Sequence, residues 1–145
     1  MTTSQTPKTR QTPQRATTAA APLRVLLPAD VTAPARARHE VRAALLRLGV
    51  GERQLEDVLL ATSELVTNAF EHGERPQRLE LEYAGGRLTL RVHDTGRMLP
   101  ELRAPSPAEA RSRGLVLVQA LSLDWGFERC PGGKYVWAVF QLPEA

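Results

Sequence analysis

The sequence predicts one α/β domain, because helical and strand-like hydrophobic patterns occur in turn along a chain of 145 residues. Apolar residues recur at helical spacing in two segments of the first half, strict alternation marks strands in the middle, and two apolar segments around a Pro-Gly-Gly turn indicate strands near the C-terminal end. A chain of this length with 42% hydrophobic residues suits one domain with an ordinary core. We assign residues 23–145 to that domain.

Residues 1–22 differ from the rest in composition. They consist mainly of Thr, Gln, Ala, Pro and Ser, without an aromatic or branched aliphatic residue, and we expect a disordered arm. This arm holds three cations and no acid, whereas the remainder balances 16 basic against 16 acidic residues. The formal net charge of +3 therefore reflects the arm, and the domain lacks the broad basic surface typical of nucleic-acid binding.

Cysteine content and hydropathy together indicate the cellular compartment of the protein. Cys130 is the single cysteine, so an internal disulfide and a multi-cysteine metal site are both excluded. The sequence has no apolar run near the roughly 18 residues of a membrane span, and its first residues lack the apolar stretch of a secretory signal. We expect a cytoplasmic protein without membrane contact.

The first predicted elements are a strand and a helix. A short apolar run from Leu23 is closed by Pro28 and indicates a strand, and a helical pattern then follows Pro34 and ends at Gly49. His39-Glu40 on this helix is similar to the phosphoacceptor motif of sensor histidine kinases. A second long helix for their dimerisation bundle does not follow, which favours an ordinary exposed histidine.

The helix predicted over residues 54–71 carries polar side chains at a spacing that matters. Its apolar residues form one broad face at 3.6-residue periodicity. Glu64, Asn68 and His72 fall within about 80° of one another, nearly opposite that face. They either converge on one ligand or decorate a solvated face, and the spacing leaves both interpretations open.

A β-hairpin is predicted next. Residues 79–83 and 88–92 alternate at period two, and Gly85-Gly86 between them favours a tight turn. The second strand leads into Asp94-Thr95-Gly96, which sets a carboxylate at a strand end where a loop can hold it against a ligand. Gly96 would let the ligand approach closely. The alternative is a turn that merely ends the strand.

Residues 97–113 form a long connection, of the kind that is often functional. A helix that is apolar around most of its circumference follows, so we expect it to be buried, and its N-terminal N–H groups favour an anion such as phosphate. Gly114 would let the anion come close and Arg113 would add positive charge, although one glycine before a helix is weak support. The chain closes with a second hairpin over residues 125–130 and 135–142, whose aromatic residues suit packing.

The order of these pieces resembles a known family. Over about residues 23–142 the sequence is similar to the GHKL, or Bergerat-fold, ATPases, and most closely to their bacterial anti-sigma serine kinase branch. Three motifs carry the resemblance: the N box Glu64-Leu-Val-Thr-Asn68-Ala-Phe-Glu-His72-Gly73, a first glycine box Asp94-Thr95-Gly96, and a second glycine box Ser112-Arg113-Gly114-Leu115.

The resemblance implies a fold and a cofactor. The fold is a two-layer α/β sandwich, with helices on one face of a mixed, largely antiparallel sheet. ATP lies between the N-box helix and residues 97–113, which form its lid. The phosphates are bound by the second glycine box through Arg113, Gly114 and Leu115.

The same resemblance implies roles for four residues. Asp94 accepts a hydrogen bond from the adenine amino group, Gly96 makes room for the ring, and Asn68 holds a Mg²⁺ ion that bridges the phosphates. Glu64 is the general base, which suits a carboxylate one helical turn from the metal ligand.

Two positions depart from the family pattern. Ser112 stands where relatives usually have another glycine, which tightens the approach of the backbone to the phosphates. Tyr135 lies near the position where many relatives have a small hydroxyl residue beside the adenine.

The resemblance favours a serine/threonine protein kinase that phosphorylates a small antagonist protein (an anti-anti-sigma factor) and sequesters a sigma factor. One alternative is a nucleotide-dependent interaction module without phosphotransfer, which Ser112 supports, and another is a detached histidine-kinase catalytic domain. Related proteins dimerise, so a homodimer is a further expectation, whereas direct contact with nucleic acid is not expected.

Overall fold

The computed structural model describes residues 23–70, 76–96 and 112–142, with backbone alone for residues 112–114. The predicted arm of residues 1–22 lies outside these ranges. So do residues 97–111 of the predicted lid, together with residues 71–73 of the N box, which include His72 and Gly73.

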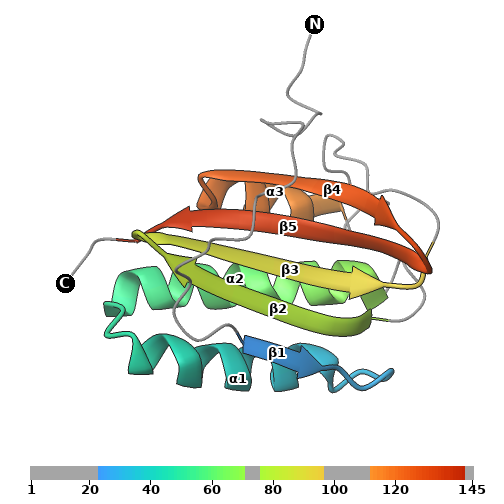
Figure 1. Ribbon diagram of the computed structural model, residues 1–145, viewed down its shortest axis with the longest axis horizontal. Coiled ribbons are helices and arrows are strands. Elements are labelled where there is room, and N and C mark those ends of the chain that lie inside the picture. The colour runs from blue at the N-terminus through green and yellow to red at the C-terminus, as the bar shows by residue number, and fades with distance from the viewer. Residues whose placement is uncertain (1–22, 71–75, 97–111, 143–145) are drawn as a thin grey trace, which may run out of the picture.

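Five strands form one sheet in the order β1-β2-β3-β5-β4 (Figure 1). Every pairing among the described strands is antiparallel, so the sheet has no parallel pair where the family resemblance allowed a mixed one. The strands are β1 Leu23–Leu26, β2 Pro76–Ala84, β3 Arg87–Asp94, β4 Asp124–Cys130 and β5 Gly133–Gln141.

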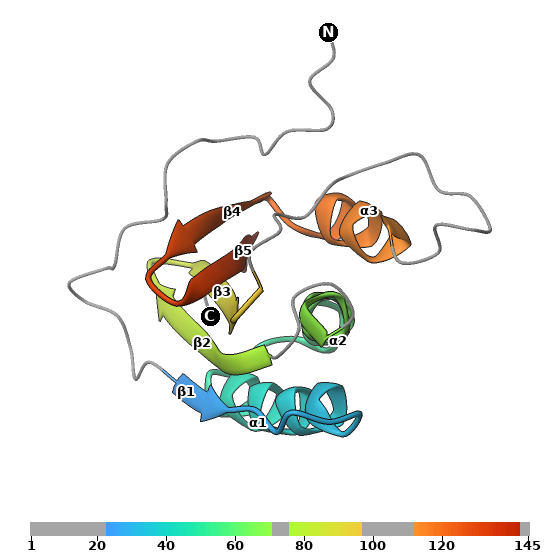
Figure 2. The ribbon, with the colours of Figure 1, turned by 90° about the vertical axis from the view of Figure 1, so that its right-hand side faces the viewer.

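In the described residues, three helices cover one face of the sheet, with α2 between α1 and α3 (Figure 2). They are α1 Ala33–Arg47, α2 Glu52–Asn68 and α3 Ser112–Leu121. This arrangement confirms the expected α/β sandwich of two layers. None of the described helices combines the length and the apolarity that crossing a membrane requires.

The period-two alternation of the strands explains why one sheet face is buried against the helices. Leu79 on β2, Leu90 on β3 and Ala138 on β5 are fully buried and belong to one core with Leu65 of α2. Burying a leucine side chain contributes about 1.5–3 kcal/mol, so these positions hold the two layers together. The hairpin turn between β2 and β3 has positive φ at Gly85 and at Gly86, as a two-residue turn of this kind requires.

The helices start and end near the predicted residues, but three details differ. The helix expected over residues 54–71 runs from Glu52 to Asn68. α3 was expected to be buried around most of its circumference, but it buries Leu115 and Val118 on one face while Leu117 is 38% exposed. Because α3 begins at Ser112, Gly114 lies in its first turn and not before it.

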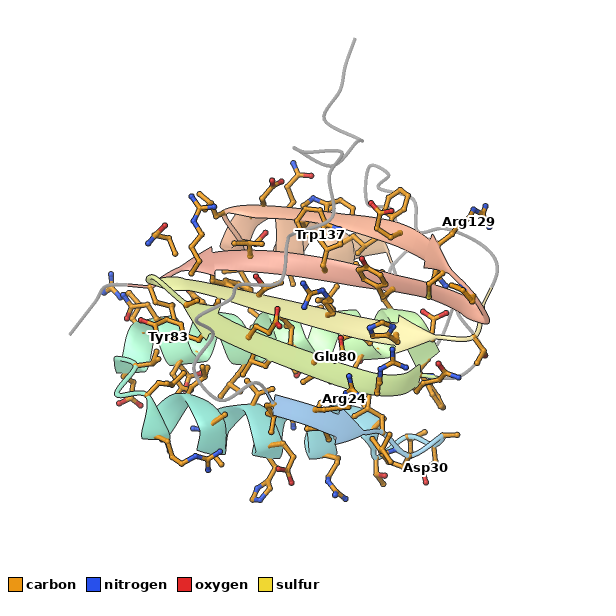
Figure 3. All side chains as sticks on the ribbon, viewed as in Figure 1. Arg24, Asp30, Glu80, Tyr83, Arg129 and Trp137 are labelled. Atoms are coloured by element: carbon orange, nitrogen blue, oxygen red, sulfur yellow. The ribbon has the colours of Figure 1, made fainter. Side chains whose placement is uncertain are left out.

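The other face of the sheet carries charged side chains. Arg91 Nη1 donates to Glu82 Oε1 at 3.1 Å, and His93 Nε2 lies 3.2 Å from Glu80 Oε1. Arg24 on β1 forms a further ion pair on this face. Its Nη2 atom lies 3.2 Å from Glu80 Oε2, and the two side chains lie next to each other in Figure 3. The sheet therefore has an apolar face toward the helices and an ion-paired face away from them.

Candidate functional site

The predicted site residues gather at one end of the two layers. In Figure 1, α2 and β3 both end at the side where β2 begins. Pro76, the first residue of β2, pairs in register with Asp94, the last residue of β3. Since β2 follows α2 in the chain, the C-terminal end of α2 lies near this edge, and α2 packs against β3.

Asp94 is buried at the end of β3, with 1% of its surface exposed. It faces the helices, because it continues the alternation of the core residues Leu90 and Val92. Its Oδ1 atom accepts the backbone N–H of Gly96 at 2.7 Å. This contact forms the local turn that the sequence allowed as an alternative.

Only one of the two carboxylate oxygens of Asp94 takes part in this turn. Asp94 Oδ2 is buried, and no residue in the described part of the chain forms a hydrogen bond with it. A buried carboxylate oxygen without a donor costs free energy unless a ligand or water satisfies it. Asp94 therefore combines a structural role at Oδ1 with a buried acceptor at Oδ2 that lacks a donor, and the amino group of an adenine base would supply one.

Lys134 supplies the counter-charge of Asp94. The two residues are direct partners in the pairing of β3 with β5. Lys134 Nζ donates to Asp94 Oδ1 at 2.7 Å, and the side chains are 3% and 0% exposed. The site thus contains a buried ion pair that our sequence analysis did not identify.

A sequence signal for Lys134 exists. Of the 19 basic residues in the chain, 17 are arginine and two are lysine, namely Lys8 and Lys134. Lys134 also continues the inward-facing positions Val136 and Ala138 of β5, so alternation places a cation on the core side of a strand. A charge on the apolar side of a strand indicates a partner of opposite charge.

The ring of Tyr135 does not lie beside Asp94. Its ring packs on His93, with ring centroids 4.8 Å apart, and His93 belongs to the ion-paired face of the sheet. Because side chains alternate along a strand, the β5 residue next to Asp94 on the helix side is Lys134.

The N-box residues Glu64 and Asn68 lie on α2. Asn68, the single asparagine of the chain, is the last residue of the helix and is 6% exposed. Glu64 is half-buried and lies one helical turn earlier. The helix therefore presents a carboxylate and an amide in succession on one side, near the edge where β3 ends.

The second glycine box lies in the first turn of α3. Leu115 is 1% exposed and packs in the core, so its side chain anchors the first turn of the helix, whose first N–H groups precede Leu115 and lack intrahelical partners. Arg113 and Gly114 fall within the helix, and their side-chain positions are outside the described part of the structure.

Metal-binding side chains are sparse. Among residues 23–70, 76–96 and 112–142, no three His, Cys, Asp or Glu side chains cluster as they would in a metal centre formed by protein ligands alone. A Mg²⁺ ion on Asn68 therefore fits with phosphate oxygens and water as further ligands, which is how this ion is often held in nucleotide sites.

Comparison with known proteins agrees with this geometry. The family model of the histidine kinase-like ATPase domain matches residues 27–140. No curated protein matches the sequence. The fold is similar to the crystal structure of the RsbU and RsbW domains of Rv1364c from Mycobacterium tuberculosis, with a TM-score of 0.68 and 25% sequence identity.

That similarity covers 86% of this chain and 34% of the Mycobacterium tuberculosis chain, so this chain spans about a third of that longer one. The family match, in contrast, extends over most of the described sandwich and includes Glu64, Asn68 and Asp94. This chain belongs to the histidine kinase-like ATPase family.

Proposed function

We propose that this domain binds ATP with Mg²⁺ and acts as a serine/threonine protein kinase of the anti-sigma type. It would phosphorylate a small antagonist protein and sequester a sigma factor in the cytoplasm. The observation that carries the nucleotide site is the buried Asp94 carboxylate, whose Oδ2 atom lacks a hydrogen-bond partner in the described structure.

Adenine recognition follows from this acceptor. The exocyclic amino group of adenine donates a hydrogen bond to Asp94 Oδ2, and the Gly96 turn, fixed by Oδ1, leaves room for the ring. Hydrogen bonds to a charged group in a buried site are worth more than neutral ones, so one contact supports both affinity and base choice.

The phosphates extend from the base toward α2 and the start of α3. Asn68 would hold Mg²⁺ together with phosphate oxygens, and the N-terminal N–H groups of α3 would bind a phosphate, with Arg113 adding charge. When bound, the ion neutralises charge that develops on the phosphates. Gly114 in the first turn of α3 would keep the approach to the backbone open.

Glu64 would accept the proton of the attacking hydroxyl. It lies one helical turn from Asn68, so a protein serine or threonine docked beside the phosphates comes within its reach. Its half-buried position restricts water around the carboxylate, which favours this role.

The partner assignment is supported by the similarity to a structure that contains an RsbW domain and by the motif resemblance to anti-sigma kinases. The nearly neutral domain suits protein partners better than nucleic acid. A homodimer would fit the same branch of the family.

Calorimetric titration with ATP, with and without Mg²⁺, tests the nucleotide site. We expect saturable binding that Mg²⁺ strengthens, and Asp94→Asn should weaken it about tenfold or more by removing a charged acceptor. Asp124→Asn on β4 is a control that removes one carboxylate elsewhere on the sheet. A folded wild-type domain that does not bind ATP would contradict the proposal.

Phosphotransfer distinguishes the kinase from the alternatives. Incubation with ATP and candidate antagonist proteins should place phosphate on a serine or threonine. ATP binding that changes partner affinity without any transfer would point to a nucleotide-dependent interaction module, and transfer to a histidine would point to a histidine-kinase catalytic domain.

A further inference from the structure

Lys134 is a buried cation beside the residue that we assign to base recognition. Its Nζ atom lies 2.7 Å from Asp94 Oδ1, and both side chains are almost completely buried. Removing two charges from water is costly, and a well-packed apolar pair often stabilises a fold as well as a buried ion pair. Fold stability by itself therefore does not account for this lysine.

The two oxygens of Asp94 have different surroundings. Oδ1 receives two donors, the Gly96 N–H and the Lys134 ammonium, each at 2.7 Å. Oδ2 receives none from the described residues. The carboxylate is thus held through one oxygen while the other stays open.

A lysine can bind Oδ1 and leave Oδ2 without a donor more readily than an arginine can. The guanidinium group presents a planar fork that commonly binds both oxygens of a carboxylate, whereas an ammonium acts as a point charge. Arginine supplies 17 of the 19 basic residues, yet position 134 holds the one lysine of the domain that begins at residue 23. The exception occurs where an arginine fork would occupy the open oxygen.

We propose that Lys134 is a positioning residue for nucleotide recognition, which holds Asp94 through Oδ1 so that Oδ2 faces the base as a single acceptor. This inference rests on the proposed ATP site and concerns how the site selects its base. A base with an amino group donates to Oδ2. A base with a keto oxygen at the same position would place two acceptors against each other.

The expected selectivity is measurable. A hydrogen bond to a charged, buried acceptor changes affinity roughly tenfold to a hundredfold. The wild-type domain should therefore prefer ATP to inosine triphosphate, which has a keto oxygen in place of the amino group, by a factor in this range.

Lys134→Met tests the role, because methionine keeps an unbranched stem but removes the charge. Without the ammonium, Oδ1 loses one of its two donors, so the Asp94 carboxylate is no longer held in the orientation that presents Oδ2 to the base. We expect ATP affinity to fall about tenfold and the preference for ATP over inosine triphosphate to fall to about one. Arg87→Met, an exposed cation at the opposite end of β3, is the control and should change neither value.

A double variant covers the case in which Lys134→Met does not fold. Asp94→Asn with Lys134→Met leaves no buried charge at this position and should fold. The reference Asp94→Asn keeps a side-chain oxygen that can accept from the Lys134 ammonium, and its circular dichroism is checked against the wild type. If Lys134 acts through Asp94, the double variant binds ATP as this reference does. A further tenfold loss would mean that Lys134 acts independently, and would overturn the proposal.

The experiment separates this inference from the proposed function. Wild-type protein that binds neither nucleotide contradicts both. Wild-type protein that prefers ATP, together with a folded Lys134→Met variant of unchanged preference, overturns the positioning role and leaves the ATP site standing. Loss of the preference in Lys134→Met, with normal circular dichroism and an unchanged Arg87→Met control, supports it.

Discussion

The Cα atom of Gly133 packs against the backbone carbonyl of Asp94, so closely that a Cβ on Gly133 would lie 1.9 Å from the carbonyl oxygen. The same Cβ would lie 2.9 Å from Thr95 Cα. Backbone cannot give way as a flexible side chain can, so the absence of a side chain at Gly133 allows β5 to reach the end of β3. This approach brings Lys134 next to Asp94.

Gly133→Ala should therefore push β5 away from Asp94. We expect the free energy of unfolding to fall by about 1–3 kcal/mol, as overpacking usually causes, and ATP affinity to fall about tenfold because the Asp94 carboxylate moves. Chemical denaturation and calorimetric titration measure the two effects.

Gly132→Ala is the matched control for this glycine. A Cβ there meets nothing within 4 Å, and its cost is the positive φ of 86°, about 1 kcal/mol. ATP affinity should stay at the wild-type value in this variant. Equal ATP affinity in both glycine variants would show that the close approach at Gly133 does not shape the site.

Glu64→Ala should separate binding from chemistry. The carboxylate is assigned to proton transfer, so ATP affinity should change less than about twofold while phosphotransfer to the antagonist protein falls at least about a hundredfold. Glu56→Ala, an exposed glutamate on the same helix, should leave both unchanged. A parallel loss of binding and transfer in Glu64→Ala would contradict the assigned role.

Asn68→Ala should remove the effect of Mg²⁺ on ATP binding. We expect the variant and the wild type to bind ATP alike in the presence of a chelator, and only the wild type to gain affinity when Mg²⁺ is added. Titrations at equal ionic strength measure this gain. A variant that retains the full gain would place the ion on other residues.

Fold stability should depend on pH through His93. Burial lowers the pKa of His93 from its ordinary value of 6.5, the charge of Arg78 lowers it further, and Glu80 opposes both only in part. The unfolded chain therefore binds this proton more readily than the folded protein. The stability that the neutral His93 contributes is therefore fully present above about pH 6.5, and the free energy of unfolding decreases as the pH falls below that value.

Chemical denaturation at pH 7 and pH 5 measures the slope of the free energy of unfolding against pH, and His93→Gln should reduce this slope. His39→Gln, at an exposed position on α1, should leave it unchanged. Glu80 titrates in a lower range, because the Arg78 hydrogen bond and the nearby charges outweigh burial and lower the pKa of its carboxyl below 4.5. An identical slope in wild type and His93→Gln would exclude this role of His93.

Local pattern was enough to predict the elements of the fold. Alternation located the first hairpin, apolar segments on either side of a Pro-Gly-Gly turn located the second, and helical periodicity located α1 and α2 to within a few residues. It was wrong about α3, because the hydrophobicity of that helix did not reveal that Leu117 lies on its exposed side. Periodicity predicts which residues lie on the same side of a helix, whereas tertiary packing decides how much of the helix surface is buried.

The motifs likewise located Asp94 at a strand end and Glu64 with Asn68 on one helix, because each depends on spacing within a single element. The contacts of Lys134 and Gly133 with Asp94 depend on the pairing of β3 with β5, strands separated along the chain by α3 and β4. Register between such strands is set by how both bury their apolar faces against the helices, which no local pattern encodes. The sequence by itself therefore determined the family, the elements and the residues of the motifs, while the tertiary structure decided which oxygen of Asp94 remains open and which cation holds the other.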